Sequence, residues 1–216
     1  MHNTRVERDG EVQYATDIVA DVKHIAYRWT QRIDETLEGR IIELMREVTA
    51  GAPIIGFGTA IADDEAKAYI KELRENLAAE KCRLLTIYSS ERELIGLCTL
   101  KRNLNPNNRH ITDLAKGMIA EKYRGGMVLP AAFHEIAIRC EQDGVEVVTL
   151  DVRADTPAHR VWQKFGFRSY GVLDDYARVN GQVFAGHFMM QKVSELKDRA
   201  IGILWPQAEQ RAAANG

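Results

Sequence analysis

The segment 114–150 constrains the fold most, because its pattern predicts a strand, a glycine turn, a helix and a second strand in close succession. An apolar run closes at Ile119. A turn follows at Tyr123-Arg124-Gly125-Gly126, since adjacent glycines accept backbone angles that other residues resist. A chain with such a unit is expected to fold as a mixed α/β domain.

Apolar residues behind this turn recur at three- and four-residue steps, with charged or polar residues between them. The spacing predicts one buried stripe on a helix. The stripe consists of Leu129, Ala132, Phe133, Ile136, Ala137 and Cys140. Pro130 fits near the helix start, Gly144 ends the helix, and a β-branched run resumes over 145–150. Unpaired backbone N–H groups at the helix start, the helix dipole and Arg124 together predict a phosphate site.

The segments before this unit predict two strand regions around a pair of amphipathic helices. A first strand is expected at 24–33, and the hairpin strands are expected at 84–88 and 94–100. Asp34 or Thr36 caps the first helix, and Asp63 or Asp64 opens the second. The buried face of the first helix is predicted to hold Leu37, Ile41, Leu44, Met45 and Val48.

The segments after Leu150 predict a short helix and a strand pair. Asp155 or Thr156 caps the helix and Gly166 ends it, with Ala158, Val161, Trp162 and Phe165 on one face. Strands at 169–173 and 182–193 are joined through 174–181 by a turn that contains Asn180-Gly181. We divide the chain into a polar leader (1–22), a main domain (23–193) and an amphipathic tail (194–216).

Composition excludes several classes of function. The net charge of −2 gives no overall field that favours nucleic acid or an anionic membrane. No apolar run reaches the roughly 20 residues that a membrane helix needs. An odd number of cysteines, without a CxxC motif or a recognised secretory leader, predicts a reducing, cytoplasmic setting. Cys82, Cys98 and Cys140 are expected to be small core residues, with a catalytic thiol as the alternative.

The histidines show no metal-ligand spacing with cysteines or carboxylates, so no metal site is expected. The glycine turn is followed by neither the lysine of a Walker loop nor the remaining glycines of a dinucleotide-binding fingerprint.

Two stretches of this chain resemble the GNAT (Gcn5-related N-acetyltransferase) superfamily over roughly 25–192. YRGGMVLPAAF leading to DGVEVVTLDV is similar to the superfamily's acyl-CoA pyrophosphate loop. DTPAHRVWQKFGF is similar to its pattern of Asn, two residues, Ala, three residues, Tyr, three residues, Gly-Phe. The resemblance implies an α/β (α+β) fold with a mixed, mostly antiparallel sheet, a central parallel pair splayed for CoA, and flanking helices. The segment from TAGAPIIGFG through NPNNRHITDL also resembles the small-molecule branch of the superfamily that includes tabtoxin-resistance-type antibiotic acetyltransferases.

The resemblance also implies which residues contact the co-substrate, acetyl-CoA or another acyl-CoA. The diphosphate would lie on the turn, the pantetheine arm along the end of the preceding strand, and the acyl group near the short helix. The residues so implied are Arg124, Gly125, Gly126, Met127, Val128 and Leu129 for the turn, Met118 and Ile119 for the strand end, and Asp155, Ala158 and Trp162 for the helix.

This chain departs from the superfamily pattern at both stretches. The loop pattern R-x-x-G-x-G/A aligns with Arg124 to Leu129, so that Met127 and Leu129 replace the two motif glycines. Asp155 replaces the asparagine, and Trp162 replaces the tyrosine that usually protonates the departing thiolate. An indole N–H is only a hydrogen-bond donor and cannot act as an acid near neutral pH.

A catalytic base is expected at the start of the strand that precedes the turn. His110 follows the polar loop 103–109, and Asp113 is an acid in an otherwise apolar strand. Either group can take a proton from an amine or hydroxyl acceptor, although a loop-end histidine and a hydrogen-bonded aspartate are the structural alternatives. Tyr170 and Tyr176 are the other phenols that could supply the missing acid.

The favoured function is therefore an acyl-CoA-dependent acyltransferase, in which a small-molecule amine or hydroxyl attacks the thioester directly. The alternative is a GNAT-fold protein that binds acyl-CoA and has lost or altered the chemistry. A partner-binding scaffold has only the amphipathic tail in its support. The resemblance allows a homodimer, because members often pair through C-terminal strands and tails.

Overall fold

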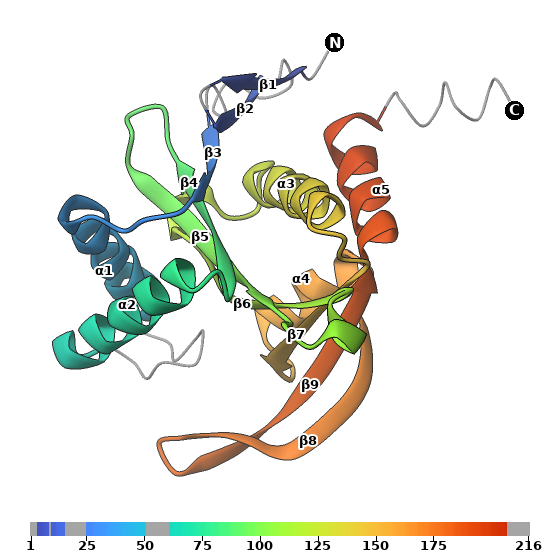
Figure 1. Ribbon diagram of the computed structural model, residues 1–216. Helices are drawn as coiled ribbons and strands as arrows, with labels where there is room; N and C mark the ends of the chain where they lie inside the picture. Colours follow the sequence, from blue (N-terminus) through green and yellow to red (C-terminus); the bar gives the residue numbers. More distant parts are fainter. Residues whose placement is uncertain (1–3, 9, 16–24, 51–60, 207–216) are drawn as a thin grey trace, which may run out of the picture. The chain divides into compact units, whose positions relative to one another are not determined.

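The computed structural model describes residues 4–8, 10–15, 25–50 and 61–206 (Figure 1). Backbone contacts divide the chain into two compact units. The first unit comprises 1–102 and 116–132, and the second comprises 103–115 and 133–216. Strand β6 (Ile111–Ile119) and helix α3 (Val128–Gln142) each contribute residues to both units.

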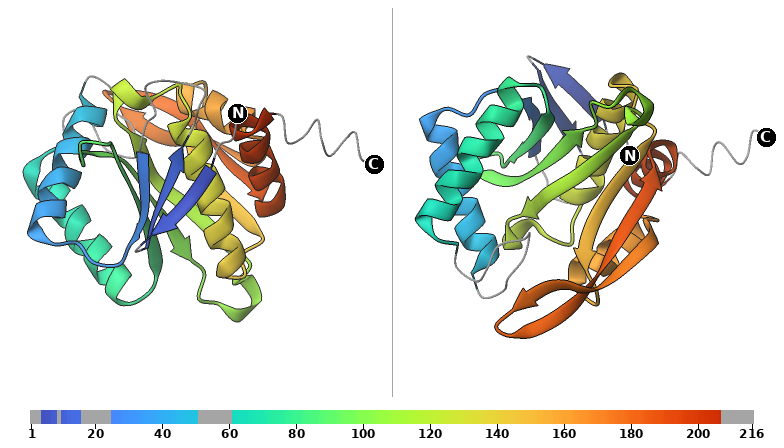
Figure 2. Two further views of the ribbon diagram at one scale, coloured as in Figure 1. Left: turned by 90° about the horizontal axis from the view of Figure 1, so that it is seen from above. Right: turned by 60° about the horizontal axis from the view of Figure 1, so that its bottom comes forward.

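The first unit is an antiparallel sheet with two helices. Its strands follow chain order, and the C-terminal part of β6 comes next to the last of them. They are β1 (Thr4–Arg8), β2 (Glu11–Ala15), β3 (Ile25–Thr30), β4 (Cys82–Tyr88) and β5 (Leu94–Arg102). Helix α1 (Glu35–Thr49) contacts β5, and α2 (Asp63–Ala78) contacts α1 and β4. Figures 1 and 2 show these two helices side by side.

The start of α1 shows how local sequence chemistry selects the element. Asp34 is the N-cap, and its carboxylate accepts a hydrogen bond from the Leu37 N–H at 2.8 Å. The five apolar residues predicted for the buried face of this helix are all buried. Helix α2 begins at Asp63, after Ala62, and its acidic first turn complements the helix dipole.

Part of the predicted leader forms strands. Residues 4–8 and 11–15 pair with each other, and β2 pairs with β3 so that Val12 lies opposite Tyr27. Val12 and Tyr27 are buried. The polar composition of this stretch concealed the strands because their backbone hydrogen bonds do not depend on apolar side chains. The division at residues 22 and 193 stays a prediction.

The second unit contains one parallel and two antiparallel strand pairs. Residues 111–113 of β6 run parallel to 147–149 of β7 (Val147–Arg153). Strand β9 (Gln182–Lys192) pairs antiparallel with β7 and with β8 (Arg168–Val179). The parallel ladder stops at Asp113 and Thr149. The sheet is thus mostly antiparallel with one parallel pair, as predicted.

Aromatic side chains form the core of the second unit. Phe133 of α3 contacts Trp162, Phe165 and Phe167, with ring centroids 5.4, 4.4 and 6.5 Å away. Trp162 lies in helix α4 (Pro157–Lys164), which contacts β7. Thr156 caps α4, because its Oγ1 accepts a hydrogen bond from the His159 N–H at 3.1 Å.

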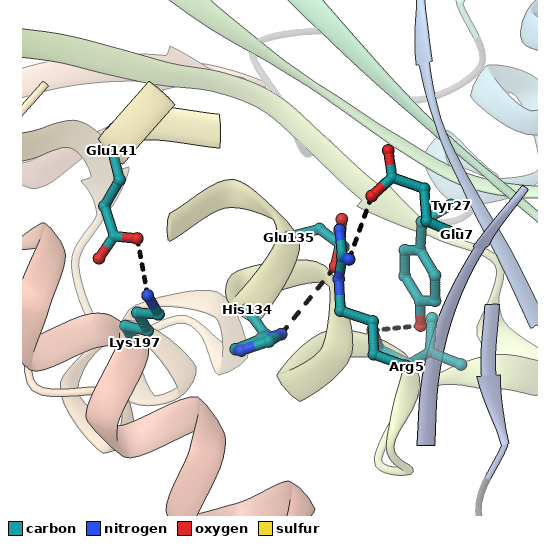
Figure 3. Close-up of polar contacts among 8 residues, drawn as sticks. Arg5, Glu7, Tyr27, His134, Glu135, Glu141 and Lys197 are labelled. Atoms are coloured by element: carbon teal, nitrogen blue, oxygen red, sulfur yellow. Dashed lines mark hydrogen bonds and ion pairs between the residues drawn. The ribbon is translucent and has the colours of Figure 1, made fainter. Parts of the chain in front are cut away.

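The predicted amphipathic tail begins with helix α5 (Val193–Leu204), which contacts β9. Its buried side chains include Leu196, Ala200 and Leu204. Lys197 is joined to Glu141 of α3 by an ion pair of 2.6 Å (Figure 3).

The hairpin turn of the second unit consists of Asn180 and Gly181, whose φ angles of 50° and 77° are both left-handed. Such a pair connects twisted antiparallel strands directly. Strand β8 therefore continues to Val179, beyond the predicted end at Leu173. The prediction stopped too early because register shifts in β8, one of them between Leu173 and Ala177, accommodate a charged stretch within the strand.

Candidate functional site

The predicted phosphate turn lies in the first unit, between the end of β6 and the start of α3. The Ala120 N–H donates to the Ile95 carbonyl at 2.8 Å and so fixes the strand end to β5. A short 3-10 helix, η2 (Glu121–Tyr123), leads to Arg124. Gly125 then adopts a φ of +79°, which favours glycine. Arg124, Gly125 and Gly126 are all exposed.

The turn presents a run of backbone donors. Among the described residues, no acceptor is bonded to the N–H groups of Gly125 to Leu129. The Met127 carbonyl accepts from the Ala131 N–H at 3.1 Å, and Pro130 carries no N–H. The positive end of the α3 dipole therefore coincides with several unpaired donors, which is the arrangement that binds phosphate groups.

A buried tyrosine holds the first residue of α3 in place. The Tyr27 hydroxyl, on β3, donates a hydrogen bond of 3.0 Å to the Val128 carbonyl (Figure 3). Tyr27 is only 1% exposed and Val128 only 3% exposed. The donors at the turn are therefore preorganised by an anchor within the same unit.

The side chains at the turn depart from an open glycine loop. Met127 and Leu129 are half-buried, so they pack partly against the protein. Arg124 folds back, and its Nε donates to the Ile119 carbonyl at 2.8 Å. Met118 is buried and Ile119 is half-buried, as core residues would be. The turn thus keeps its donors and places a cation at the strand end.

The second unit brings together a phenol and two carboxylates. Asp113 lies opposite Thr149 in the parallel pair. The Thr149 hydroxyl lies 3.2 Å from the Thr112 carbonyl and 3.4 Å from Asp113 Oδ1, so its one proton is shared between these two acceptors. Asp151 shares the face of Thr149 because side chains two apart on a strand point the same way. The Tyr176 hydroxyl, from β8, donates to Asp151.

The environment of Tyr176 decides its protonation. Burial, the hydrogen bond to Asp151 and the charges of Asp151 and Asp113 raise the pKa of this phenol well above its usual value, while Arg153 opposes them. Tyr176 therefore stays protonated and donates a hydrogen bond to Asp151. This disfavours Tyr176 as the replacement acid, and Tyr170 is largely exposed.

Trp162 belongs to the aromatic core. Its ring is half-buried and packs 5.4 Å from Phe133 and 5.2 Å from Phe167, between centroids. Ala158 on the same helix is exposed. Asp155, just before the helix, has a φ of +58°, and its carbonyl accepts from Arg160 at 3.3 Å. These positions show structural roles, and their contacts to a co-substrate stay predictions.

His110 acts through its backbone. Its carbonyl accepts hydrogen bonds from the N–H groups of Glu146 and Val147, at 2.8 and 3.0 Å. Its side chain is exposed, and within the described ranges no hydrogen bond or ring contact joins it to Asp113. Of the two candidate bases, only Asp113 interacts electrostatically with Tyr176 among the groups that shift its pKa.

The predicted core role of the cysteines is confirmed, since all three are buried and none forms a disulfide. Burial is the main cause that raises the pKa of the Cys140 thiol to about 12. Burial also raises the pKa of Cys82. A thiol that stays protonated near neutral pH is a poor nucleophile, so the catalytic alternative is disfavoured.

We did not predict Asp151 as a site residue from the sequence, although the alternating pattern of β7 indicates that its side chain lies on an open face. Polar residues alternate with apolar ones along this strand: Thr149, Asp151 and Arg153 interleave with Val148, Leu150 and Val152. The second set is buried and the first is not. This alternation indicates a strand with one open face.

His159 yields a test of pH dependence. Its ring is 7% exposed and is stacked on His187 with 4.3 Å between centroids, and among the described residues its Nε2 has no hydrogen-bond partner. Burial, followed by the charge of His187, lowers the pKa of His159. The unfolded chain therefore binds this proton more readily, and stability is lost as pH falls below the ordinary histidine value of about 6.5.

We expect the wild type to lose more stability than His159→Phe between about pH 7.5 and about pH 5. The phenyl ring keeps the stack on His187 but takes no proton. Urea unfolding at both pH values measures this difference. Equal losses in the two proteins would contradict the assignment.

Within the described residues, no three or more His, Cys, Asp and Glu side chains gather to hold a metal ion. In the same part of the chain, no helix has the length and apolar character that a membrane crossing requires.

No family profile and no curated protein matches the sequence. Solved structures, in contrast, share this architecture. A GNAT-family acetyltransferase from Streptococcus pneumoniae is 15% identical, covering 78% of this chain and 99% of its own, with a TM-score of 0.62. A ribosomal-protein-alanine N-acetyltransferase from Brucella melitensis is 17% identical, with coverages of 77% and 98% and a TM-score of 0.62.

A spermidine N-acetyltransferase SpeG chimera from Vibrio cholerae and hSSAT is 16% identical, covers 80% of this chain and 97% of its own, and has a TM-score of 0.63. Identities this low establish a shared fold and nothing finer. The likeness to tabtoxin-resistance enzymes stays a prediction. With its mostly antiparallel sheet, parallel β6–β7 pair and flanking helices, the chain has the GNAT fold.

Proposed function

We propose that this protein is an acyl-CoA-dependent acyltransferase that transfers an acyl group from acetyl-CoA or another acyl-CoA to a small-molecule amine or hydroxyl, with N-acetylation of an amine as the favoured reaction. The observation that carries the proposal is the run of unpaired amides from Gly125 to Leu129 at the start of α3. Those donors suit the diphosphate of CoA. The GNAT fold of the chain supports the same co-substrate, because the compared structures are named acetyltransferases.

The chemistry needs positioning and a proton acceptor. The acceptor nitrogen loses a proton, its lone pair attacks the acyl carbon, and the C–S bond breaks with its electron pair on sulfur. No covalent enzyme intermediate is required. Trp162 donates no proton to the sulfur, so the thiolate leaves unprotonated or takes a proton from water.

The open face of β7 supports a basic acceptor. Asp113 and Asp151 offer carboxylates there, beside the half-buried Phe188. A small amine of the kind that tabtoxin-resistance enzymes modify fits this chemistry. Three buried cysteines that form no disulfide support a reducing, cytoplasmic setting.

A single missing amide tests the proposed diphosphate site. Val128→Pro removes one N–H at a position where helices accept proline. Val128→Ala also loses the valine side chain but keeps the N–H, so it is the matched control. We expect Val128→Pro to weaken CoA binding at least about tenfold relative to Val128→Ala, as measured by calorimetric titration. Equal affinities in the two variants would contradict the proposal.

The second candidate function is acyl-CoA binding with lost or altered catalysis. Two observations favour it: Trp162 packs in the aromatic core, and Tyr176 stays protonated while its hydroxyl donates a hydrogen bond to Asp151. Release of CoA from acetyl-CoA in the presence of a panel of amines separates the two functions. Binding without release would favour the second.

A further inference from the structure

The face that carries Tyr176 is built around a glycine. Between Leu173 and Ala177 of β8 the register shifts, because these residues pair with Gly186 and Phe184 on β9. Three residues of β8 therefore lie opposite one residue of β9. This bulge sets the Tyr176 ring directly over Gly186, where any Cβ would collide with the ring.

From this position the phenol reaches across β9 to β7. Asp151 lies opposite Phe188 of β9, and Arg153 lies opposite Gly186. The Tyr176 ring packs edge-on to Phe188, with 6.3 Å between centroids, and its hydroxyl donates to Asp151 Oδ2. The bulge in β8 and the missing Cβ of Gly186 together allow the Tyr176 hydroxyl to reach Asp151.

In this arrangement only one of the two carboxylate oxygens of Asp151 is hydrogen-bonded to Tyr176. One carboxylate oxygen accepts a hydrogen bond from the phenol, and among the described residues no donor is hydrogen-bonded to Oδ1. The charged groups that face this pair are Asp113 from β6 and Arg153 from β7. The residues of β9 around it, Gly186 and Phe188, carry no titratable group.

We propose that Asp151 is the catalytic base of the acyl transfer and that Tyr176 is its positioning residue. This inference rests on the proposed function. Oδ1 takes the proton from the acceptor's ammonium group, and the freed lone pair forms the C–N bond to the acyl carbon. The C–S bond breaks, and its electron pair leaves on sulfur as the CoA thiolate.

Tyr176 suits the positioning role because its proton stays on the phenol throughout. A permanent donor holds the carboxylate in one orientation and leaves the other oxygen for the acceptor. Asp113 is the rival base, and the 3.4 Å between its Oδ1 and the Thr149 hydroxyl shows that it too lies on this face.

The test measures CoA release from acetyl-CoA with a panel of primary amines, from about pH 6 to about pH 9. Asp151→Asn is expected to lower kcat by about a hundredfold or more. Tyr176→Phe keeps the ring over Gly186, so it is expected to lower kcat about tenfold and to shift the acid limb of the kcat profile, with KM for acetyl-CoA unchanged. The double variant should be no slower than Asp151→Asn.

Asp174→Asn is the matched control, since Asp174 is an exposed carboxylate in the same bulge. It is expected to keep the wild-type rate. The inference is overturned if Asp151→Asn keeps its kcat while amines are acylated, or if Asp113→Asn alone abolishes the reaction. Failure of the proposed function is distinct, because the wild type itself would then bind no CoA in calorimetry, or bind CoA and acylate no amine. Either result would overturn the proposed function together with this inference.

Discussion

Replacing Phe133 by alanine is expected to lower the free energy of unfolding by about 4 kcal/mol. Phe133 is 1% exposed and contacts three aromatic rings, from Trp162, Phe165 and Phe167. Its removal leaves a cavity that rigid rings cannot fill by small rotations. Urea unfolding followed by circular dichroism measures the loss.

Phe184→Ala is the control, because Phe184 is half-buried and lies under the Arg153 guanidinium at 4.7 Å. Its expected cost is about 1 kcal/mol. If both variants lost equal stability, the core of the second unit would not be centred on Phe133.

Gly186→Ala is expected to destabilise the protein by about 3 kcal/mol. The new Cβ would occupy the place of the Tyr176 ring, so that the ring must move and its hydrogen bond to Asp151 must break. The same unfolding experiment measures this effect.

Gly171→Ala provides the comparison for this substitution. Gly171 lies in the neighbouring strand, and its Cβ would meet the Phe188 ring at 3.8 Å, an ordinary contact distance. We expect a change within about 0.5 kcal/mol. A Gly186→Ala variant as stable as Gly171→Ala would show that Tyr176 does not lie over Gly186.

Elements with strong local periodicity could be predicted from the sequence. The α1 face was correct at all five positions, and the α3 stripe is buried except at Leu129, which is half-buried. The glycine turn before α3 was also predictable, because its donors and its left-handed Gly125 depend on residues close in sequence. Residues close in sequence were therefore enough to predict the turn and its backbone donors, on which the proposed diphosphate site depends.

Features that depend on strand register could not be predicted in this way. The contact between Tyr176 and Asp151 crosses β9, so it requires the register shift near Leu173 and the missing Cβ of Gly186. Neither leaves a periodic signal. The strands within the predicted leader were not predicted for a related reason. Strand β2 is held by backbone pairing with β3, which leaves no periodic pattern of side chains.

The central claim is that the amides of Gly125 to Leu129 bind the diphosphate of CoA. Proton–nitrogen correlation spectra recorded during a CoA titration test it at the atoms concerned. We predict that the largest chemical-shift changes fall on the amides of Gly125, Gly126, Met127, Val128 and Leu129. The claim would be contradicted if CoA saturated the protein while these amides stayed unshifted, or if no amide shifted at any CoA concentration.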